Sequence, residues 1–246
     1  MDAGPATCGA AAHVLVPDLA DELSVDGADG HHLARVRRLR VGERVSAADG
    51  AGAWREFVVA AVADRVLELR ADGPTQHAPR PDPQVAVAFA ITKGSKPDVV
   101  VRQLTELGVD RLAPVVGSRS VARPRAERVG SVTERLCRVA REAAMQSRRA
   151  WLPAVDAPVP LVDLAGTDGL VVAELGAPTA RDLAAPGPQG WTLVVGPEGG
   201  LTTEEVRALA PAGRLGLGPH VLRAETAAVA GAALLIHLRQ IGDFPE

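Results

Sequence analysis

Aromatic side chains are scarce in this chain of 246 residues, which has three Phe, three Trp and no Tyr. This excludes RNA binding on a platform of stacked aromatic rings. Cys8 and Cys137 stand far apart and outside any C-x-x-C pair, which excludes a disulfide scaffold and favours a reduced, cytoplasmic protein. No apolar run is long enough to span a membrane, and residues 1–12 lack a basic segment, so we expect neither a membrane anchor nor a signal peptide.

Lysine is scarce as well, because only Lys93 and Lys96 among the 27 basic residues are lysines. The net charge of -3 argues against a uniformly basic nucleic-acid binder, but the arginines are clustered. Nine lie from Arg119 to Arg149 and five from Arg35 to Arg44. Because a guanidinium pairs bidentately with phosphate, this clustering favours a polyanionic partner. The alternative interpretation is that codon usage favours arginine and that these side chains only form a solvent-exposed helix face.

The hydrophobic pattern changes once along the chain, which predicts two domains. In residues 1–72, short β-type segments surround a basic helix at about residues 31–39, in which Leu33, Val36 and Leu39 have helical spacing. We predict a small β-barrel there. The Pro-rich stretch 73–84 is expected to be a linker. In residues 85–246, strands alternate with helices, which predicts an α/β domain with a parallel sheet. The segments expected in this domain are strands at 85–92, 111–116, 170–174, 193–195 and 214–217, and helices at 95–108, 124–148, 202–209 and 224–239.

Two glycine-containing loops in the second domain are candidates for a binding site. The first, Gly196 to Thr202, leaves an apolar strand and enters a helix, but it contains no phosphate-binding lysine. Its Glu198 favours a neutral or cationic ligand over a nucleotide phosphate. Taken alone, this loop is equally consistent with a tight turn. The six histidines show no metal-ligand spacing, so we expect no metal site.

The second loop, residues 215–226, also follows a strand and places Arg223 and Glu225 at a helix N-terminus, where Thr226 is a candidate cap. If the two strands are neighbours in a parallel sheet, both loops meet over one crevice at its carboxyl edge. An ordinary capping pair on the helix is the alternative interpretation.

Several motifs taken together resemble one known family. They are His31–Leu33, Val36–Glu43, Thr105–Val109, Arg119–Val121, Glu142–Arg149, Gly196–Leu201 and the segment from Leu215 to Ala227. In this order they resemble the bacterial 16S ribosomal RNA uridine N3-methyltransferases, a branch of the SPOUT superfamily, over nearly the whole chain. One departure is Met145, where the family pattern has a second glutamine.

The resemblance implies a SPOUT α/β domain with a trefoil knot, preceded by a PUA-like barrel that binds RNA. It implies methyl transfer from S-adenosylmethionine to N3 of a uridine (uridine 1498) in 16S ribosomal RNA of the small subunit. A homodimer is also implied. Arg223 would stabilise the uracil anion, with Glu225 or Glu198 as possible proton acceptors. The residues implied to bind the cofactor are Leu175, Gly196, Pro197, Glu198, Gly199, Gly200, Leu215, Gly216, Leu217, Leu222 and Thr226. The arginines expected to hold RNA phosphates are Arg35, Arg37, Arg38, Arg40, Arg119, Arg123, Arg148 and Arg149.

Three other functions are compatible with parts of the pattern. The same fold could serve as a non-catalytic RNA-binding or ribosome-assembly factor, which binding of S-adenosylmethionine would discriminate. A SPOUT methyltransferase for another RNA is a second alternative. A nucleotide-dependent oxidoreductase is disfavoured, because the chain lacks the G-x-G-x-x-G fingerprint and the acidic residue that follows it by about 20 positions.

Overall fold

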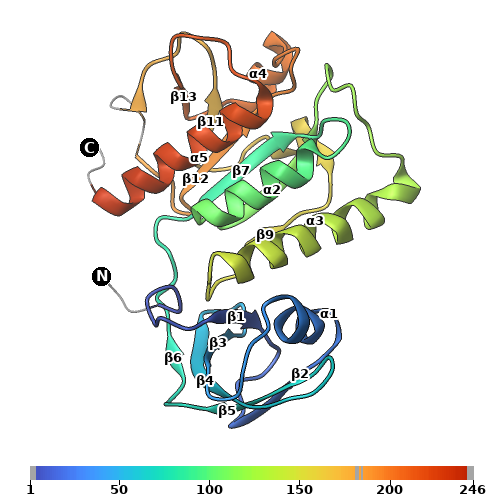
Figure 1. Cartoon of the computed structure of the whole chain (residues 1–246). Coiled ribbons are helices and arrows are strands. Elements are labelled where there is room, and N and C mark those ends of the chain that lie inside the picture. The colour runs from blue at the N-terminus through green and yellow to red at the C-terminus, as the bar shows by residue number, and fades with distance from the viewer. Residues whose placement is uncertain (1–3, 181–182, 184, 243–246) are drawn as a thin grey trace. The chain divides into compact units, whose positions relative to one another are not determined.

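The computed structural model describes residues 4–180, 183 and 185–242 (Figure 1). The chain divides into two compact units. The first holds residues 1–80 and 144–152, and the second holds residues 81–143 and 153–246. This division differs from the predicted boundaries in two respects. Part of the expected linker belongs to the first unit, and so does a segment from the middle of the chain.

The first unit is built on one mixed sheet, whose strands are β1 (Ala12–Leu15), β2 (Glu22–Val25), β3 (Arg44–Ala48), β4 (Ala53–Val62), β5 (Leu67–Ala71) and β6 (Gln76–His77). The order is β1-β3-β4-β5-β2, and β6 pairs with β4. Only β1 and β3 run parallel. Alternating apolar residues such as Val45, Phe57 and Leu69 form its core. The sequence analysis missed β2, whose polar–apolar alternation is only four residues long and whose Leu23 stays partly exposed.

The predicted basic helix is present but begins earlier and has a different geometry. It consists of α1 (Gly27–His31) followed by a π-helical segment, His32–Val36. Leu33 and Leu39 are buried as expected, whereas Val36 is 61% exposed. The prediction for Val36 was therefore wrong. It assumed the 3.6-residue turn of an α-helix, and the wider π turn moves residue i+3 off the face occupied by residue i.

The middle segment 144–152 is held in the first unit by polar and apolar contacts. The Nε2 of His13 lies 3.2 Å from the Arg149 carbonyl oxygen, and its Nδ1 lies 2.8 Å from the Ser46 hydroxyl. Burial is the main reason why the pKa of His13 falls to about 4. Trp151 Nε1 donates to the carbonyls of Ala78 and Pro79, both 3.1 Å away. These bonds fix the part of the chain that contains Arg148 and Arg149.

The second unit contains a parallel sheet whose long strands and helices confirm the predicted alternation. Its main strands are β7 (Val85–Ala90), β8 (Arg111–Val116), β11 (Leu170–Ala173), β12 (Trp191–Val195) and β13 (Gly213–Leu215). The chain between β8 and β11 also forms two short strands, β9 (Ala154–Val155) and β10 (Val159–Pro160), and a 3-10 helix, Leu161–Leu164, directly after β10. The order is β10-β8-β7-β12-β11-β13, and β9 pairs with β8. The sequence analysis did not predict β9 or β10, which have two residues each and too little pattern to detect.

The helices of this unit are α2 (Lys96–Leu107), α3 (Ala126–Gln146), α4 (Thr203–Leu209) and α5 (Ala224–Ile241). Residues 144–146, the end of α3, belong to the first unit. Helices α2 and α5 lie side by side against the sheet, where α5 contacts β7 and β12 (Figure 1). Small residues permit this close packing: a Cβ on Gly231 of α5 would lie 2.5 Å from the Leu193 side chain. In the described residues, no helix combines the length and the apolar character needed to cross a bilayer.

Candidate active site

A cavity of about 310 Å³ opens at the carboxyl edge of the parallel sheet, in the second unit. Its walls come from the ends of β11 and β12, the loop after β13 and the start of α5. The two glycine-containing loops therefore border one cavity, as the sequence suggested. Their strands are not neighbours, however, because β11 lies between β12 and β13. The end of β11 thus supplies a third wall, which includes Glu174 and Leu175.

The first loop passes closely over the apolar end of β12. Gly196, Pro197, Glu198 and Gly200 border the cavity, whereas Gly199 does not. A side chain on Gly196 would bring its Cβ within 2.9 Å of Leu201 Cδ2, so a glycine allows the close approach. Gly199 has another contact, because its carbonyl accepts a hydrogen bond of 2.7 Å from Arg119.

A buried carboxylate fixes the far end of this loop. Glu205 accepts hydrogen bonds from the amides of Thr202, at 2.8 Å, and Ser118, at 2.6 Å, while the Thr202 hydroxyl caps α4. Burial alone would raise the pKa of Glu205, but these bonds outweigh it and lower the pKa below its ordinary value. Glu205 is therefore a structural anion that ties the loop after β8 to the start of α4.

The second loop is held against the segment that follows β11. The Gly216 amide donates a 2.7 Å hydrogen bond to the Pro178 carbonyl, and a Cβ on Gly216 would lie 2.2 Å from the Ala177 oxygen. Leu217 and Leu222 border the cavity. Leu215 is fully buried in the core behind it. Leu215 and Gly216 thus support the loop rather than line the cavity.

Helix α5 begins beside the cavity, with Arg223 at its N-cap position. The Arg223 side chain is exposed, and among the described residues its guanidinium forms no hydrogen bond or ion pair. The helix has no side-chain cap, so the interpretation of Thr226 as a cap was wrong. Thr226 is the third residue of the helix, in its first turn, exposed and outside the cavity lining. A first-turn residue is past the position from which a hydroxyl reaches the free amides.

Lys96, which the sequence analysis overlooked, joins the two loops. Its Nζ lies 3.5 Å from Oε1 of Glu198 and 3.3 Å from Oε1 of Glu225. The pKa of Glu225 is lowered, first by a hydrogen bond from its own backbone amide and then by Lys96, against the opposing effect of burial. In the sequence, the only sign that Lys96 belongs to the site was that Lys96 and Lys93 are the chain's two lysines and follow a strand of the same sheet. A carboxylate with a lowered pKa is a weak proton acceptor.

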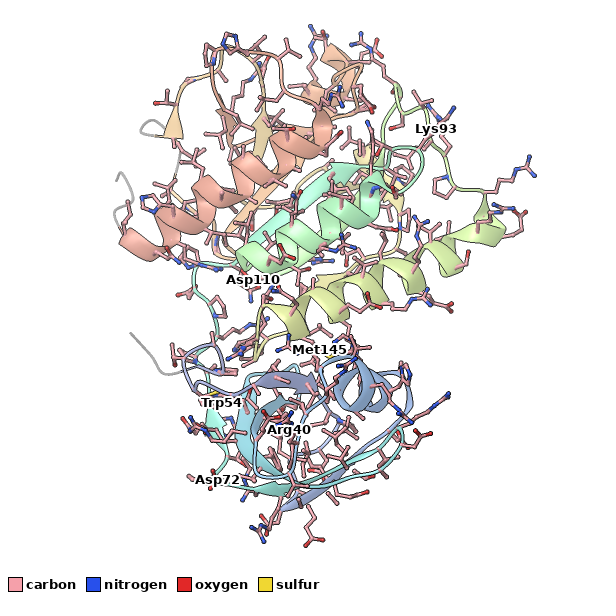
Figure 2. All side chains as sticks on the ribbon, in the orientation of Figure 1. Arg40, Trp54, Asp72, Lys93, Asp110 and Met145 are labelled. Carbon is pink, nitrogen blue, oxygen red and sulfur yellow. The ribbon has the colours of Figure 1, made fainter. Side chains whose placement is uncertain are left out.

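The arginines expected to bind RNA are distributed over both units. In the first, Arg35, Arg37, Arg38 and Arg40 are exposed along one short segment. Two of them are partly engaged: Arg35 pairs with Asp64, and Arg37 donates to the Ala11 carbonyl at 2.6 Å. Figure 2 labels Arg40 in this unit.

The remaining four arginines are half-buried or hydrogen-bonded to backbone. Arg148 donates to the Ala10 carbonyl at 2.6 Å, and Arg149 is partly exposed next to it. In the second unit, Arg119 contacts Gly199, and Arg123 donates to the Ser118 carbonyl at 2.7 Å. The structure therefore brings Arg119 and Arg123 to the site's edge of the sheet.

Both units match families whose chemistry is known. Residues 79–236 match the RNA methyltransferase domain, and residues 25–70 match the RNA methyltransferase PUA domain. The fold and its cavity at the sheet edge thus define an enzyme of the RNA methyltransferase class, with a SPOUT-type α/β unit preceded by a PUA-like unit.

Comparison with individual proteins identifies the family. The chain is 36% identical to the ribosomal RNA small subunit methyltransferase E of Mycobacterium bovis, over 87% of this chain and 85% of that one. It is 30% identical to the protein of the same name from Bacillus subtilis, over 85% and 87%. The chain belongs to this family, ribosomal RNA small subunit methyltransferase E.

A solved structure has the same fold. The chain superposes on a methyltransferase from Legionella pneumophila, in complex with the bound cofactor SAM, with a TM-score of 0.80 and 25% identity. The alignment covers 91% of this chain and 96% of that chain. Both units of the fold are therefore found together in a relative. The trefoil knot stays a prediction.

Proposed function

We propose that the enzyme transfers a methyl group from S-adenosylmethionine to N3 of a uridine in the RNA of the small ribosomal subunit. The observation that carries this proposal is the composition of the cavity. Glu174 and Glu198 line it, together with apolar side chains and glycine backbone; Glu174 pairs with Arg214 at 2.6 Å and Glu198 with Lys96 at 3.5 Å. No lysine or arginine is among its lining residues in the described chain. Such a site suits a cationic sulfonium better than a nucleotide phosphate, which needs basic groups.

The residues on the cavity wall would hold the cofactor. Those that were predicted and that border the cavity are Leu175, Gly196, Pro197, Glu198, Gly200, Leu217 and Leu222. Gly199, Leu215 and Gly216 would act by shaping the loops, whereas Thr226 does not line the cavity. When bound, S-adenosylmethionine would supply a methyl group on a positively charged sulfur, and N3 of a uracil anion can attack this carbon while the C–S bond breaks and the neutral thioether of S-adenosylhomocysteine leaves.

The protein's task is then to create and hold that anion. N3 of uridine carries a proton at neutral pH, so negative charge develops on the uracil carbonyl oxygens as the proton leaves. The free guanidinium of Arg223, beside the cavity, would donate hydrogen bonds to one of these oxygens. Glu198 or Glu225 would accept the proton. Glu198 is 47% exposed and is the more accessible of the two.

Three further properties belong to the same proposal. The family resemblance implies 16S RNA, with uridine 1498 as the target. It also implies a homodimer in which α5 contributes to the site near the subunit interface. An enzyme that modifies ribosomal RNA would work where ribosomes are assembled, in the cytoplasm.

Methyl transfer to ribosomal RNA tests the proposal directly. Small subunits from a strain that lacks this gene are incubated with the enzyme and S-adenosylmethionine labelled in the methyl group. We expect one labelled nucleoside, N3-methyluridine, and mapping by primer extension should place it in 16S RNA. Label in another nucleoside or in another RNA would contradict the assigned target. Naked 16S transcript, tested in parallel, tells whether the assembled subunit is needed.

We expect Lys96→Met to lower kcat/KM for methyl transfer by roughly ten-fold, because the two loops that it joins lose their common anchor. Without the ammonium, the pKa of Glu225 rises. If the Glu225 carboxylate must be ionised, the acidic limb of the pH–rate profile therefore moves to higher pH. The measurement is kcat/KM between pH 5 and 9.

The conservative variant Lys96→Arg serves as the control, since it keeps the positive charge. It should restore the position of the acidic limb and most of the rate. If Lys96→Met leaves both the rate and the profile unchanged, Lys96 has no role in positioning the loops.

A further inference from the structure

A second, basic pocket of about 580 Å³ lies beside the start of α3 in the same unit. Its polar lining is cationic: Lys93, Arg123, Arg125, Arg128 and Arg135. The floor is apolar and includes Leu136. We propose that this basic pocket binds the phosphodiester backbone of the RNA substrate, next to the nucleotide that is methylated. The proposal rests on the proposed function for the choice of RNA as the polyanion.

Three of the five cations are available for a ligand. Lys93, Arg125 and Arg128 are exposed, and none forms an ion pair or side-chain hydrogen bond with another described residue. Arg135 is neutralised by Asp98, with 3.2 Å between Nε and Oδ1. Arg123 donates to two backbone carbonyls and keeps its charge. The pocket thus concentrates uncompensated positive charge in a concave surface, which attracts a polyanion.

The pocket and the cavity lie at the same edge of the sheet. Strands β7 and β12 are parallel neighbours, and Phe89 is in register with Val195. The loop after β7, which contains Lys93 (labelled in Figure 2), therefore emerges beside the loop that starts at Gly196. At the start of α2, Pro97 lines the basic pocket, while Lys96 contacts Glu198 of the cavity. An RNA strand held in the pocket is thus led to the cavity.

The charges of the two hollows complement the two substrates. The described lining of the cavity contains two carboxylates, paired with Arg214 and Lys96, and no lysine or arginine, which suits a sulfonium better than a phosphate. The basic pocket presents unpaired cations, which suit phosphates. An extended strand fits the pocket better than a single free anion does. The free cations come from two separate segments: Lys93 lies in the loop after β7, whereas Arg125 and Arg128 lie around the start of α3. They can therefore contact successive phosphates of one strand.

The double variant Arg125→Gln/Arg128→Gln tests the proposal. Both side chains are exposed, so the fold should be retained. Affinity for a 16S transcript is measured by filter binding over a range of KCl concentrations. Each phosphate contact contributes about 0.7 to 0.9 to the slope of log K against log salt. We expect the double variant to lower that slope by about 1.4 to 1.8 and to weaken RNA binding, with unchanged affinity for S-adenosylmethionine in calorimetry.

Arg138→Gln is the matched control, because Arg138 is an exposed arginine on the same helix that does not line the pocket. It should leave the slope within error of the wild type. If the double variant also keeps the wild-type slope, the proposal is overturned. Inorganic phosphate, titrated at constant ionic strength, tests for a free-anion site. If phosphate binds the wild type but not the double variant, and the two proteins have the same salt slope for RNA binding, the pocket binds free anions and the proposal is equally overturned.

Failure of the proposed function gives a different result. A wild-type enzyme that neither binds S-adenosylmethionine nor methylates the subunit would refute the methyltransferase assignment. The RNA-binding slopes would still report on the pocket. Conversely, normal methylation by the double variant, with an unchanged KM for RNA, would overturn the pocket and leave the proposed function intact.

Discussion

Arg223→Ala is expected to lower kcat for methyl transfer by about 100- to 1000-fold while binding of S-adenosylmethionine changes little. A loss of this size is typical when one donor that stabilises a developing oxyanion is removed. Arg223 is suited to this role because its neighbours Leu222 and Ala224 border the cavity and its guanidinium forms no hydrogen bond or ion pair with the described residues, although its charge helps to lower the pKa of Glu225. Single-turnover methyl transfer and calorimetric titration of the cofactor measure the two effects separately.

Two further variants make the interpretation specific. Arg223→Lys keeps the charge but cannot form a bidentate contact, so it should recover only part of the rate. Arg102→Ala, which removes an exposed arginine from α2 away from the cavity lining, should retain full activity. Full methyl transfer by Arg223→Ala would show that the uracil anion is stabilised elsewhere. Loss of cofactor binding in that variant would instead assign Arg223 to the cofactor site.

The carboxyl edge of the parallel sheet could be predicted well from sequence. Continuous apolar strands such as Val85–Ala90 and Trp191–Val195 are buried on both faces, which leaves a clear signal. Glycines mark the positions where the chain must come close to itself, as at Gly196 and Gly216. For that reason both loops were located before the geometry was known, and the structure brings them to one cavity.

The order of the strands could not be predicted in the same way. The position of β11 between β12 and β13 depends on how the connections cross between the strands, and no local sequence pattern predicts it. The contact of Lys96 with Glu198 and Glu225 could not be predicted either, because these partners are about 100 and 130 residues away in sequence and only the fold brings them together. Long-range ion pairs leave no periodic signal, so the lysine was detected only in the structure.

The first unit shows where local rules fail. The spacing of Leu33, Val36 and Leu39 suggested one apolar face, but the π-helical segment exposes Val36. Residues 144–148 were predicted to be the end of an arginine-rich helix, and the whole segment 144–152 to belong to the second domain. Its place in the first unit depends on Trp151 and on the carbonyl of Arg149, whose partners lie far away in sequence.

Arg239→Met is expected to have the largest effect on stability, a loss of about 3–5 kcal/mol in the free energy of unfolding. Arg239, in the last turn of α5, lies 2.6 Å from Asp110, and the two side chains are 12% and 9% exposed. Its Nη2 also donates to the Gly108 carbonyl at 3.2 Å. Asp110, labelled in Figure 2, accepts a 2.9 Å bond from the Val85 amide at the start of β7. Methionine retains much of the packing volume but leaves a buried carboxylate without its cation.

Arg111→Met provides a matched comparison in the same unit. Its pair with Asp156 has a similar distance, 2.8 Å, but the two side chains are 60% and 29% exposed. Because water screens exposed charges, this variant should lose about 1 kcal/mol or less. Hydrogen exchange at the amides of β7 and β12, followed by mass spectrometry, reports the stability of this unit by itself.

The double variant Asp110→Asn/Arg239→Met separates the loss of a pair from the cost of an unpaired charge. The neutral amide needs no cation, so the double variant should be more stable than Arg239→Met alone, although it carries one more substitution. Strictly additive losses would mean that the two side chains act independently. In that case the position of α5, and of Arg223 at its opposite end, depends on the apolar packing against β7 and β12 rather than on this ion pair.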